Sequence, residues 1–270
     1  MIELNKIYNE DCLEGMKRIP DKSVDMILCD LPYGTTKCKW DTVLPFERLW
    51  EQYKRIIKDR GQIVLFATEP FTSQLVSSNL KWYREHLTWI KSKPSNFASA
   101  KYVHMKYTED IITFGNGSGT YNPQMQPRIS RRVEQAHKSG WERNATNTSI
   151  ISFSPKNPRN IPSSNWDANW KYPMDYLNFN QASGKEKTIH QTQKPVKLFE
   201  YLIKTYSNMG ETVLDNCIGS GTTAIACLNT ERNFIGFELD KEYYEIAQNR
   251  IEERQSQSNL FDVGTLEVIE

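Results

Sequence analysis

Short apolar runs alternate with amphipathic stretches over the first part of the chain. Apolar runs bounded by turn residues are typical of buried strands, whereas apolar positions at helical spacing are typical of helices. The stretch FERLWEQYKRIIKD (46–59) has the helical spacing, and the Asp-Arg-Gly that follows predicts a helix that stops at Gly61. Strands are predicted over SVDMILCD (23–30), QIVLFAT (62–68), HLTWIK (86–91) and EDIITFG (109–115).

The same rhythm returns near the other end of the chain. PVKLFEYLIKTYS has helical spacing and places Pro195 at a first-turn position, where its missing N–H costs nothing. Strands that alternate with helices predict an α/β sheet with helices on its faces. The further elements predicted here are strands over 211–215 and 233–240 and helices over 222–230 and 241–254.

Residues 116–189 lack this rhythm and are dense in Asn, Ser, Pro and Arg. A polar composition of this kind is typical of loops, although scattered aromatic residues favour a small irregular subdomain over full disorder. The sequence therefore predicts two halves of one domain, 1–115 and 190–255, separated by an insertion at 116–189. A tail at 256–270 is expected to fray or to dock weakly.

Charge changes this picture only through its distribution. The net charge of the 270 residues is +1, which indicates no class of partner. Residues 116–195 carry eleven Lys and Arg against five Asp and Glu, so this segment has a charge of +6 inside a body of −5. Such a segment is either a surface that faces a polyanion or an ordinary solvated loop region, and charge alone leaves both open.

Cysteine usage and hydropathy bear on the compartment. The five cysteines are odd in number and form no CxxC pair, which argues against a disulfide framework and against a zinc site. No apolar stretch is long enough for a signal peptide or a membrane span. The sequence thus predicts a cytoplasmic protein that binds neither metal nor membrane.

A glycine-rich turn indicates a cofactor site. In DNCIGSGTTA, the residues Gly219, Gly221 and Ala224 fit G-x-G-x-x-G/A between a predicted strand and a predicted helix, and Glu238 ends the next strand. Glycines permit a close approach to the backbone, the helix amino end offers free N–H groups, and Glu238 can accept both hydroxyls of a ribose. The turn predicts an adenosine-type cofactor and leaves NAD and S-adenosylmethionine as alternatives.

The tetrapeptide Asp-Leu-Pro-Tyr follows the strand at 23–30 and suits the methylation of an exocyclic amine. Two acceptors, the Asp30 carboxylate and the Leu31 carbonyl, would turn the nitrogen lone pair towards a methyl donor. Pro32 favours an extended Leu31, and Tyr33 offers a face for base stacking, worth roughly 1–3 kcal/mol. The alternative is an ordinary exit from a strand, which is less favoured because a cofactor turn is present elsewhere.

These motifs together resemble those of the amino-group DNA methyltransferases of the β class. DLPYG resembles their DPPY motif, DNCIGSGTT their DPFxGSGTT loop, and HQTQKP, from His190, their HxTxKP motif. The order of catalytic motif, recognition segment and cofactor motif is the circularly permuted order of that class. The resemblance implies a Rossmann-like S-adenosylmethionine-dependent methyltransferase fold of the α/β class with an inserted target recognition region.

The resemblance also implies roles for individual residues. Asp30, the Leu31 carbonyl, Pro32 and Tyr33 would hold the target amine. Candidates for DNA contacts in the basic insertion are Arg128, Arg131, Arg132, Lys138 and Arg143. The residues implied for the cofactor pocket are Asp11 and Cys12 near the adenine, Glu238 at the ribose, Lys194 and Pro195 closing over the pocket, Asp215, Gly219, Ser220, Gly221 and Thr222 at the methionine part, and Asp30.

Two positions depart from the family pattern. Leu31 stands where the family usually has proline, which puts the stiffness of the loop in doubt. Asn216 and Cys217 replace Pro-Phe, which removes an aromatic ring from the cofactor pocket.

The function that follows is site-specific methylation of the N6 amine of a flipped-out adenine in double-stranded DNA, as in a restriction–modification system. Cytosine-N4 methylation is the nearest alternative, since both amines present the same two hydrogens. An NAD-dependent oxidoreductase and a non-catalytic DNA-binding module are more distant alternatives. The sequence leaves open whether the chain works as a homodimer.

Overall fold

The structure is a computed structural model and describes residues 2–34, 42–127, 170–180 and 193–264. The chain forms two compact units, 123–173 and the remainder. In the smaller unit, β6 (Gln126–Pro127) pairs antiparallel with β7 (Trp170–Lys171). The larger unit contains the main sheet and all of the predicted site residues that the structure describes.

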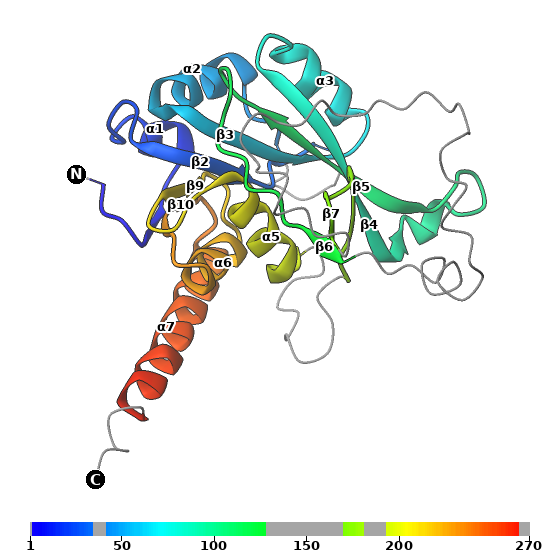
Figure 1. Cartoon of the computed structure of the whole chain (residues 1–270). Coiled ribbons are helices and arrows are strands. Elements are labelled where there is room, and N and C mark those ends of the chain that lie inside the picture. Colours follow the sequence, from blue (N-terminus) through cyan, green and yellow to red (C-terminus); the bar gives the residue numbers. More distant parts are fainter. Residues whose placement is uncertain (1, 35–41, 128–169, 181–192, 265–270) are drawn as a thin grey trace, which may run out of the picture. The chain divides into compact units, whose positions relative to one another are not determined.

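The main sheet has eight described strands in the order β1-β10-β9-β2-β3-β5-β4-β8 (Figure 1). Only β5 runs against its neighbours β3 and β4 in this sheet, and the remaining described pairs are parallel. The strands are β1 (Lys6–Asn9), β2 (Val24–Cys29), β3 (Ile57–Ala67), β4 (Tyr83–Ser95), β5 (Lys106–Phe114), β8 (Tyr176–Asn178), β9 (Thr212–Asp215) and β10 (Asn233–Glu238).

Helices cover both faces of the sheet (Figure 1). One face carries α1 to α3, and the other carries α5 to α7. None of the helices within the described residues is long and apolar enough to cross a membrane. The helices are α1 (Cys12–Met16), α2 (Phe46–Ile56), α3 (Phe71–Ser78), the 3-10 turn η1 (Phe97–Ser99), α5 (Val196–Tyr206), α6 (Thr222–Asn229) and α7 (Lys241–Gly264).

Strand β2 is apolar from Met26 to Cys29 because both of its faces are covered there. Ile27 and Cys29 pack into the core beneath α1 to α3, whereas Met26 and Leu28 pack into the core beneath α5 to α7. Successive side chains of a strand point to opposite faces, so a strand that is covered on both faces has no polar side.

The strand order joins the two halves of the domain. β2 pairs with β9 through Met26–Val213 and Ile27–Leu214, although the two strands are far apart in the sequence. From β2 the chain crosses to β3 by way of α2, and from β9 it crosses the other way to β10 by way of α6. This is a topological switch point, and open α/β sheets bind ligands outside the carboxyl ends of the strands at such a point.

The predicted strands and helices of both halves are present, with two differences. Gly61 does not end a helix, because α2 stops at Ile56 and the backbone passes directly into β3. A Cβ at Gly61 would lie 2.6 Å from Ile57 Cγ1 and 2.9 Å from the Asp25 carbonyl oxygen, so close packing between strands explains this glycine. The second difference is the tail, because α7 continues to Gly264 with no Pro or Gly before that residue to stop it.

Candidate active site

Asp30 is the first residue after β2 and lies at the carboxyl edge of the sheet. Its Oδ1 accepts a hydrogen bond from the Tyr33 hydroxyl, and its Oδ2 accepts one of 2.7 Å from Lys194 Nζ. The Tyr33 ring packs against Phe71, with 5.3 Å between the ring centroids. Leu31 is 3% exposed and belongs to the core, so burial fixes this loop where the first proline of the family's DPPY motif is missing.

Lys194 lies between two carboxylates. Its Nζ is 3.1 Å from Glu109 Oε2, an ion pair without hydrogen-bond alignment, and Glu109 Oε1 accepts a hydrogen bond of 3.1 Å from Lys91. Burial lowers the pKa of Lys194, but Asp30 and Glu109 outweigh it, so this pKa lies above its ordinary value. Burial likewise raises the pKa of Glu109, but the two lysines leave that pKa below its ordinary value. Four charges of alternating sign therefore hold the loop that begins at Asp30 against β4 and β5.

The cofactor turn follows β9, the neighbour of β2. Asp215 is 3% exposed and accepts hydrogen bonds from the Cys217 N–H, at 3.1 Å, and from the Thr223 hydroxyl. Burial raises the pKa of Asp215 to about 7 although these hydrogen bonds lower it. The negative charge of Asp30 makes a smaller contribution to the same rise in pKa.

Two glycines of this turn have left-handed backbones. Gly219 has φ +53° and Gly221 has φ +83°, values that side chains rarely tolerate. A Cβ at Gly221 would lie 3.0 Å from Ala247 Cβ on α7, whereas nothing lies within 4 Å of a Cβ at Gly219. The turn is thus closed against α7 at Gly221 and has room on the side of Gly219.

Glu238 connects the turn to the end of β10. Its Oε2 accepts a hydrogen bond from the Gly219 N–H, and its Oε1 accepts one from the Asp240 N–H, both of 2.8 Å. Burial raises the pKa of this carboxyl group, and the two backbone donors oppose the rise. Glu238 therefore fixes the turn in addition to the ribose role that the family resemblance implies.

The other predicted pocket residues lie in the turn itself or at the amino ends of helices. Asp11 caps α1 by accepting hydrogen bonds from the N–H groups of Leu13, at 2.8 Å, and Glu14, at 3.1 Å. Ser220 is held by Arg250, whose Nη1 is 3.1 Å from its hydroxyl oxygen. Thr222 is buried in the first turn of α6, and Pro195 directly precedes α5.

Asn216, one of the two departures from the family pattern, has partners of its own. Its side chain is 2% exposed and accepts a hydrogen bond from the Tyr53 hydroxyl. Its amide nitrogen lies 3.7 Å from Cys12 Sγ and 3.5 Å from Cys217 Sγ. The Asn216 amide thus links α1 and α2 to the cofactor turn. The family's Pro-Phe has no polar side-chain group that could make these contacts.

Several residues of this site were not predicted from the sequence. Two of them, Glu109 and Lys91, lie in predicted strands, and Tyr53 lies in a predicted helix. The only sign in the sequence that they belong to a site is a charged group or a hydroxyl at a position that the hydrophobic pattern alone would bury. Conversely, His190 and the proposed DNA contacts lie outside the described residues; these contacts are Arg128, Arg131, Arg132, Lys138 and Arg143.

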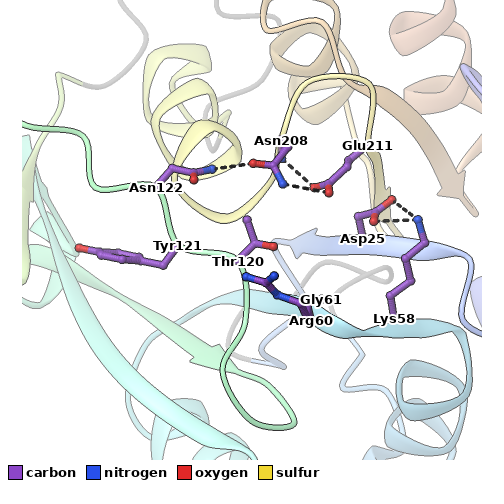
Figure 2. Close-up of a pocket in the computed structure, with 9 residues that line it drawn as sticks. All are labelled: Asp25, Lys58, Arg60, Gly61, Thr120, Tyr121, Asn122, Asn208 and Glu211. Carbon is purple, nitrogen blue, oxygen red and sulfur yellow. Dashed lines mark hydrogen bonds and ion pairs between the residues drawn. The ribbon is translucent and has the colours of Figure 1, made fainter. Parts of the chain in front are cut away.

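A separate hollow of about 230 Å³ lies at the opposite edge of the sheet (Figure 2). Its polar groups largely bond to one another: Lys58 Nζ pairs with the Asp25 carboxylate at 2.8 Å, and the Asn208 N–H donates to Glu211 at 2.7 Å. None of the predicted site residues lines this hollow.

Comparison with known proteins places these features in a family. The sequence profile of the N6/N4 methyltransferases, described as DNA methylase, matches residues 24–249. The chain belongs to this DNA methylase family. The predicted membership among the amino-group DNA methyltransferases and the predicted Rossmann-like α/β fold are thereby confirmed.

Curated relatives cover nearly the whole of this DNA methylase. The Type II methyltransferase M1.MboII of Moraxella bovis is 29% identical over 259 residues, which cover 90% of this chain and 95% of the relative. The DNA adenine methyltransferase YhdJ of Escherichia coli (strain K12) is 28% identical over 263 residues, which cover 93% and 83%.

Solved structures agree on the fold. The M1.HpyAVI–SAM complex has a TM-score of 0.60 and 25% identity, and the match covers 91% of this chain and 98% of that one. The cytosine-N4-specific PvuII DNA methyltransferase has a TM-score of 0.61 and 13% identity, with 92% and 86% covered. This second likeness shows the fold alone, so the fold does not distinguish adenine from cytosine as the target.

Proposed function

We propose that this DNA methylase transfers a methyl group from S-adenosylmethionine to the N6 amine of an adenine in double-stranded DNA. The observation that carries the proposal is the position of Asp30. It follows β2 at the switch point, directly beside the turn after β9 that carries Asp215 and the two left-handed glycines. A carboxylate acceptor and a cofactor turn are thus neighbours at the place where this class of sheet binds its ligands.

The residues of the turn fit S-adenosylmethionine. This cofactor, when bound, supplies a methyl group on a positively charged sulfur. Asp215 is a buried carboxyl group, and a cationic ligand beside it would stabilise its ionised form. Glu238 places a second carboxyl group at the end of the neighbouring strand. The open side of the turn at Gly219 leaves room for a ligand close to the backbone. NAD offers the buried Asp215 carboxyl group no cationic amino-acid end to bind.

The groups around Asp30 fit an exocyclic amine. The Asp30 carboxylate and the Leu31 carbonyl are two acceptors for the two hydrogens of the amine, which would orient the lone pair. Lys194 and the Tyr33 hydroxyl each hold one oxygen of Asp30, so the carboxylate has one orientation. Catalysis would then come from positioning and electrostatics, without a covalent intermediate on the protein.

Adenine is favoured over cytosine by two observations. The motif begins with Asp30, as in adenine-specific members of the family it resembles, and YhdJ is named as an adenine methyltransferase. Cytosine N4 is the second candidate because the PvuII enzyme of the same fold is named as cytosine-N4-specific. Either base must leave the duplex to reach Asp30, at a cost of a few kcal/mol.

The partner and the assembly follow as part of the same proposal. Phosphate contacts from the basic insertion would help to offset the cost of flipping, and they predict binding that weakens with salt. A cytoplasmic location and a homodimer are part of the proposal. Sedimentation with and without duplex DNA measures the number of copies.

Sequencing the DNA of a methylation-free host that expresses the protein tests the proposal. Reads that are sensitive to modification should show N6-methyladenine within one sequence context, and the same host with Asp30→Ala should show none. Modified cytosine in place of adenine would select the second candidate. Calorimetry adds a test of the cofactor, because tight binding of NAD without binding of S-adenosylmethionine would overturn the proposal.

A further inference from the structure

The hairpin of β4 and β5 projects from the edge of the sheet that carries the active site. Ala67 at the carboxyl end of β3 pairs with Asp110, and Asp110 pairs with Thr88 on β4. Because β4 runs parallel to β3 and continues past Thr88 to Ser95, the turn between the two strands lies beyond this edge. We call residues 96–105 the hairpin tip.

The hairpin tip has a defined conformation. Asn96, with φ 59°, closes its base: its Oδ1 accepts a hydrogen bond of 2.8 Å from the Lys106 N–H, and its amide donates to the His104 carbonyl at 3.3 Å. Within the tip, the N–H groups of Tyr102 and Val103 donate to the Ser99 carbonyl at 2.9 and 3.0 Å. The tip thus presents its side chains from a fixed backbone.

The side chains that it presents are large, apolar and exposed. Tyr102 is 86% exposed, Phe97 66% and Val103 56%, with Met105 and Tyr107 beside them. A cluster of exposed apolar residues on a folded domain marks an interaction surface. The cluster is unusual in its setting, because residues 92–108 contain three lysines and a histidine but no acidic residue.

The hairpin tip stands on the frame that holds Asp30. Lys91, on β4, bonds both to Ser95 at the base of the tip and to Glu109, each at 3.1 Å. Glu109 in turn contacts Lys194, which holds Asp30. On the β5 side, Lys106 Nζ donates to the Glu69 carbonyl at 3.3 Å. The tip and the catalytic carboxylate are therefore parts of one connected arrangement.

We propose that the hairpin tip binds the DNA substrate next to the flipped base, with Tyr102 and Phe97 packing on exposed bases and Lys101 contacting a phosphate. Aromatic rings interleaved with lysines are the chemistry that unpaired or unstacked nucleotides require. A duplex with one nucleotide flipped out offers such a surface beside the catalytic pocket. The inference rests on the proposed function, since it assigns a surface to the DNA that the active site acts on.

Charge argues for DNA over a second copy of the chain as the occupant. In a twofold dimer the same patch faces itself, so two hairpin tips would bring their lysines together with no acidic residue of residues 92–108 to compensate. A polyanion meets the same lysines with complementary charge. A dimer through the tip is therefore an outcome that the experiment must separate from DNA binding.

The experiment compares Tyr102→Ala and Phe97→Ala with Leu80→Ala. Leu80 is 66% exposed, as is Phe97, and lies in the loop before β4, at the opposite end of that strand from the hairpin tip. Unmethylated genomic DNA and S-adenosylmethionine are the substrates. We expect each tip variant to lower kcat/KM for DNA about tenfold, within the range of one base stack, with unchanged KM for S-adenosylmethionine. Leu80→Ala should match the wild type, and Lys101→Ala should reduce the salt slope of DNA binding by about 0.9.

Three results would overturn the inference. The first is equality of the tip variants and Leu80→Ala in kcat/KM for DNA and in duplex binding by fluorescence anisotropy. The second is an equal rise of KM for both substrates, which would show a general disturbance of the site. The third is a change of sedimentation coefficient in the tip variants alone. Anisotropy needs no turnover, so loss of methylation in the wild type would refute the proposed function while the tip remains testable.

Discussion

Replacing Lys194 with methionine removes a cation that touches both Asp30 and Glu109, and the cost can be worked out from the structure. Lys194 is 10% exposed, Glu109 18% and Asp30 31%. Removing one partner of a buried ion pair costs about 3–5 kcal/mol, because the remaining charge is left uncompensated. Two features reduce this cost: Asp30 is partly exposed, and Glu109 keeps its ion pair with Lys91. We therefore expect the free energy of unfolding to fall by about 2–3 kcal/mol at pH 7.5.

The pH dependence of this loss identifies its cause. The pKa of Glu109 lies below the ordinary 4.5, because its ion pairs outweigh burial. An acid with a lowered folded pKa stabilises the fold above its unfolded pKa, and this stabilisation is lost as pH falls through the folded pKa. In Lys194→Met, burial is opposed by Lys91 alone, so the pKa of Glu109 rises. The difference between the two proteins should therefore shrink from pH 7.5 to pH 4.

Urea denaturation at both pH values measures the effect, and a thermal scan at pH 7.5 should show a fall in Tm of roughly 4–12 °C. Lys197→Met is the matched control, since Lys197 is 76% exposed and only 3.5 Å from Glu200 in an i,i+3 pair. Such a surface pair is worth about 0–1 kcal/mol. Equal losses in both variants, or a loss in Lys194→Met that does not change with pH, would refute this reading of the four-charge arrangement.

Three further predictions concern the cofactor turn. Burial raises the pKa of Asp215 from 3.8 to about 7, so ionisation costs stability as pH rises towards 7, and a cationic ligand reverses this cost. Affinity for S-adenosylmethionine, measured by calorimetry, should rise by up to about tenfold per pH unit below pH 7, and Asp215→Asn should abolish the slope. Gly221→Ala should lower the free energy of unfolding by about 1–2 kcal/mol because of the left-handed backbone, and by more because the new methyl group meets Ala247 of α7. Gly219→Ala should show the backbone effect alone, so an equal fall in Tm for the two variants would contradict the packing at Gly221. Asn216→Ala leaves the buried Tyr53 hydroxyl without its acceptor and should lower the free energy of unfolding, measured by urea denaturation, by about 1–3 kcal/mol. Adding Tyr53→Phe to this variant removes the unpaired hydroxyl, so the double variant should lose less.

The parts of the fold that follow from local pattern were predictable from the sequence. β2, β9 and β10 are buried on both faces along most of their length, so each contains a short apolar run. The glycine turn needs backbone angles that restrict its residue types. Gly61 was misread because a glycine after a helical pattern normally ends the helix, and the close approach to Asp25 depends on the pairing of β2 with β3. Local pattern does not contain that pairing.

The unpredicted part of the site depends on register in the same way. Glu109 and Lys91 come together because β4 pairs with β5, and Glu109 reaches Lys194 because α5 begins beside that end of the sheet. The exposure of Tyr102 and Phe97 is likewise a property of the hairpin, since the same letters in a covered strand would be core residues. The motifs predict which residues form the site, and that assignment stays a prediction, whereas long-range pairing determines which side chains hold Asp30 and Lys194 in place.

Transfer of a radiolabelled methyl group from S-adenosylmethionine to unmethylated duplex DNA, followed by nucleoside analysis, tests the central claim most directly. The wild type should place label in N6-methyldeoxyadenosine, and Asp30→Ala and Tyr33→Ala should place none while S-adenosylmethionine still binds. Full transfer by both variants, or no label in DNA from a wild type that binds the cofactor, would contradict the account.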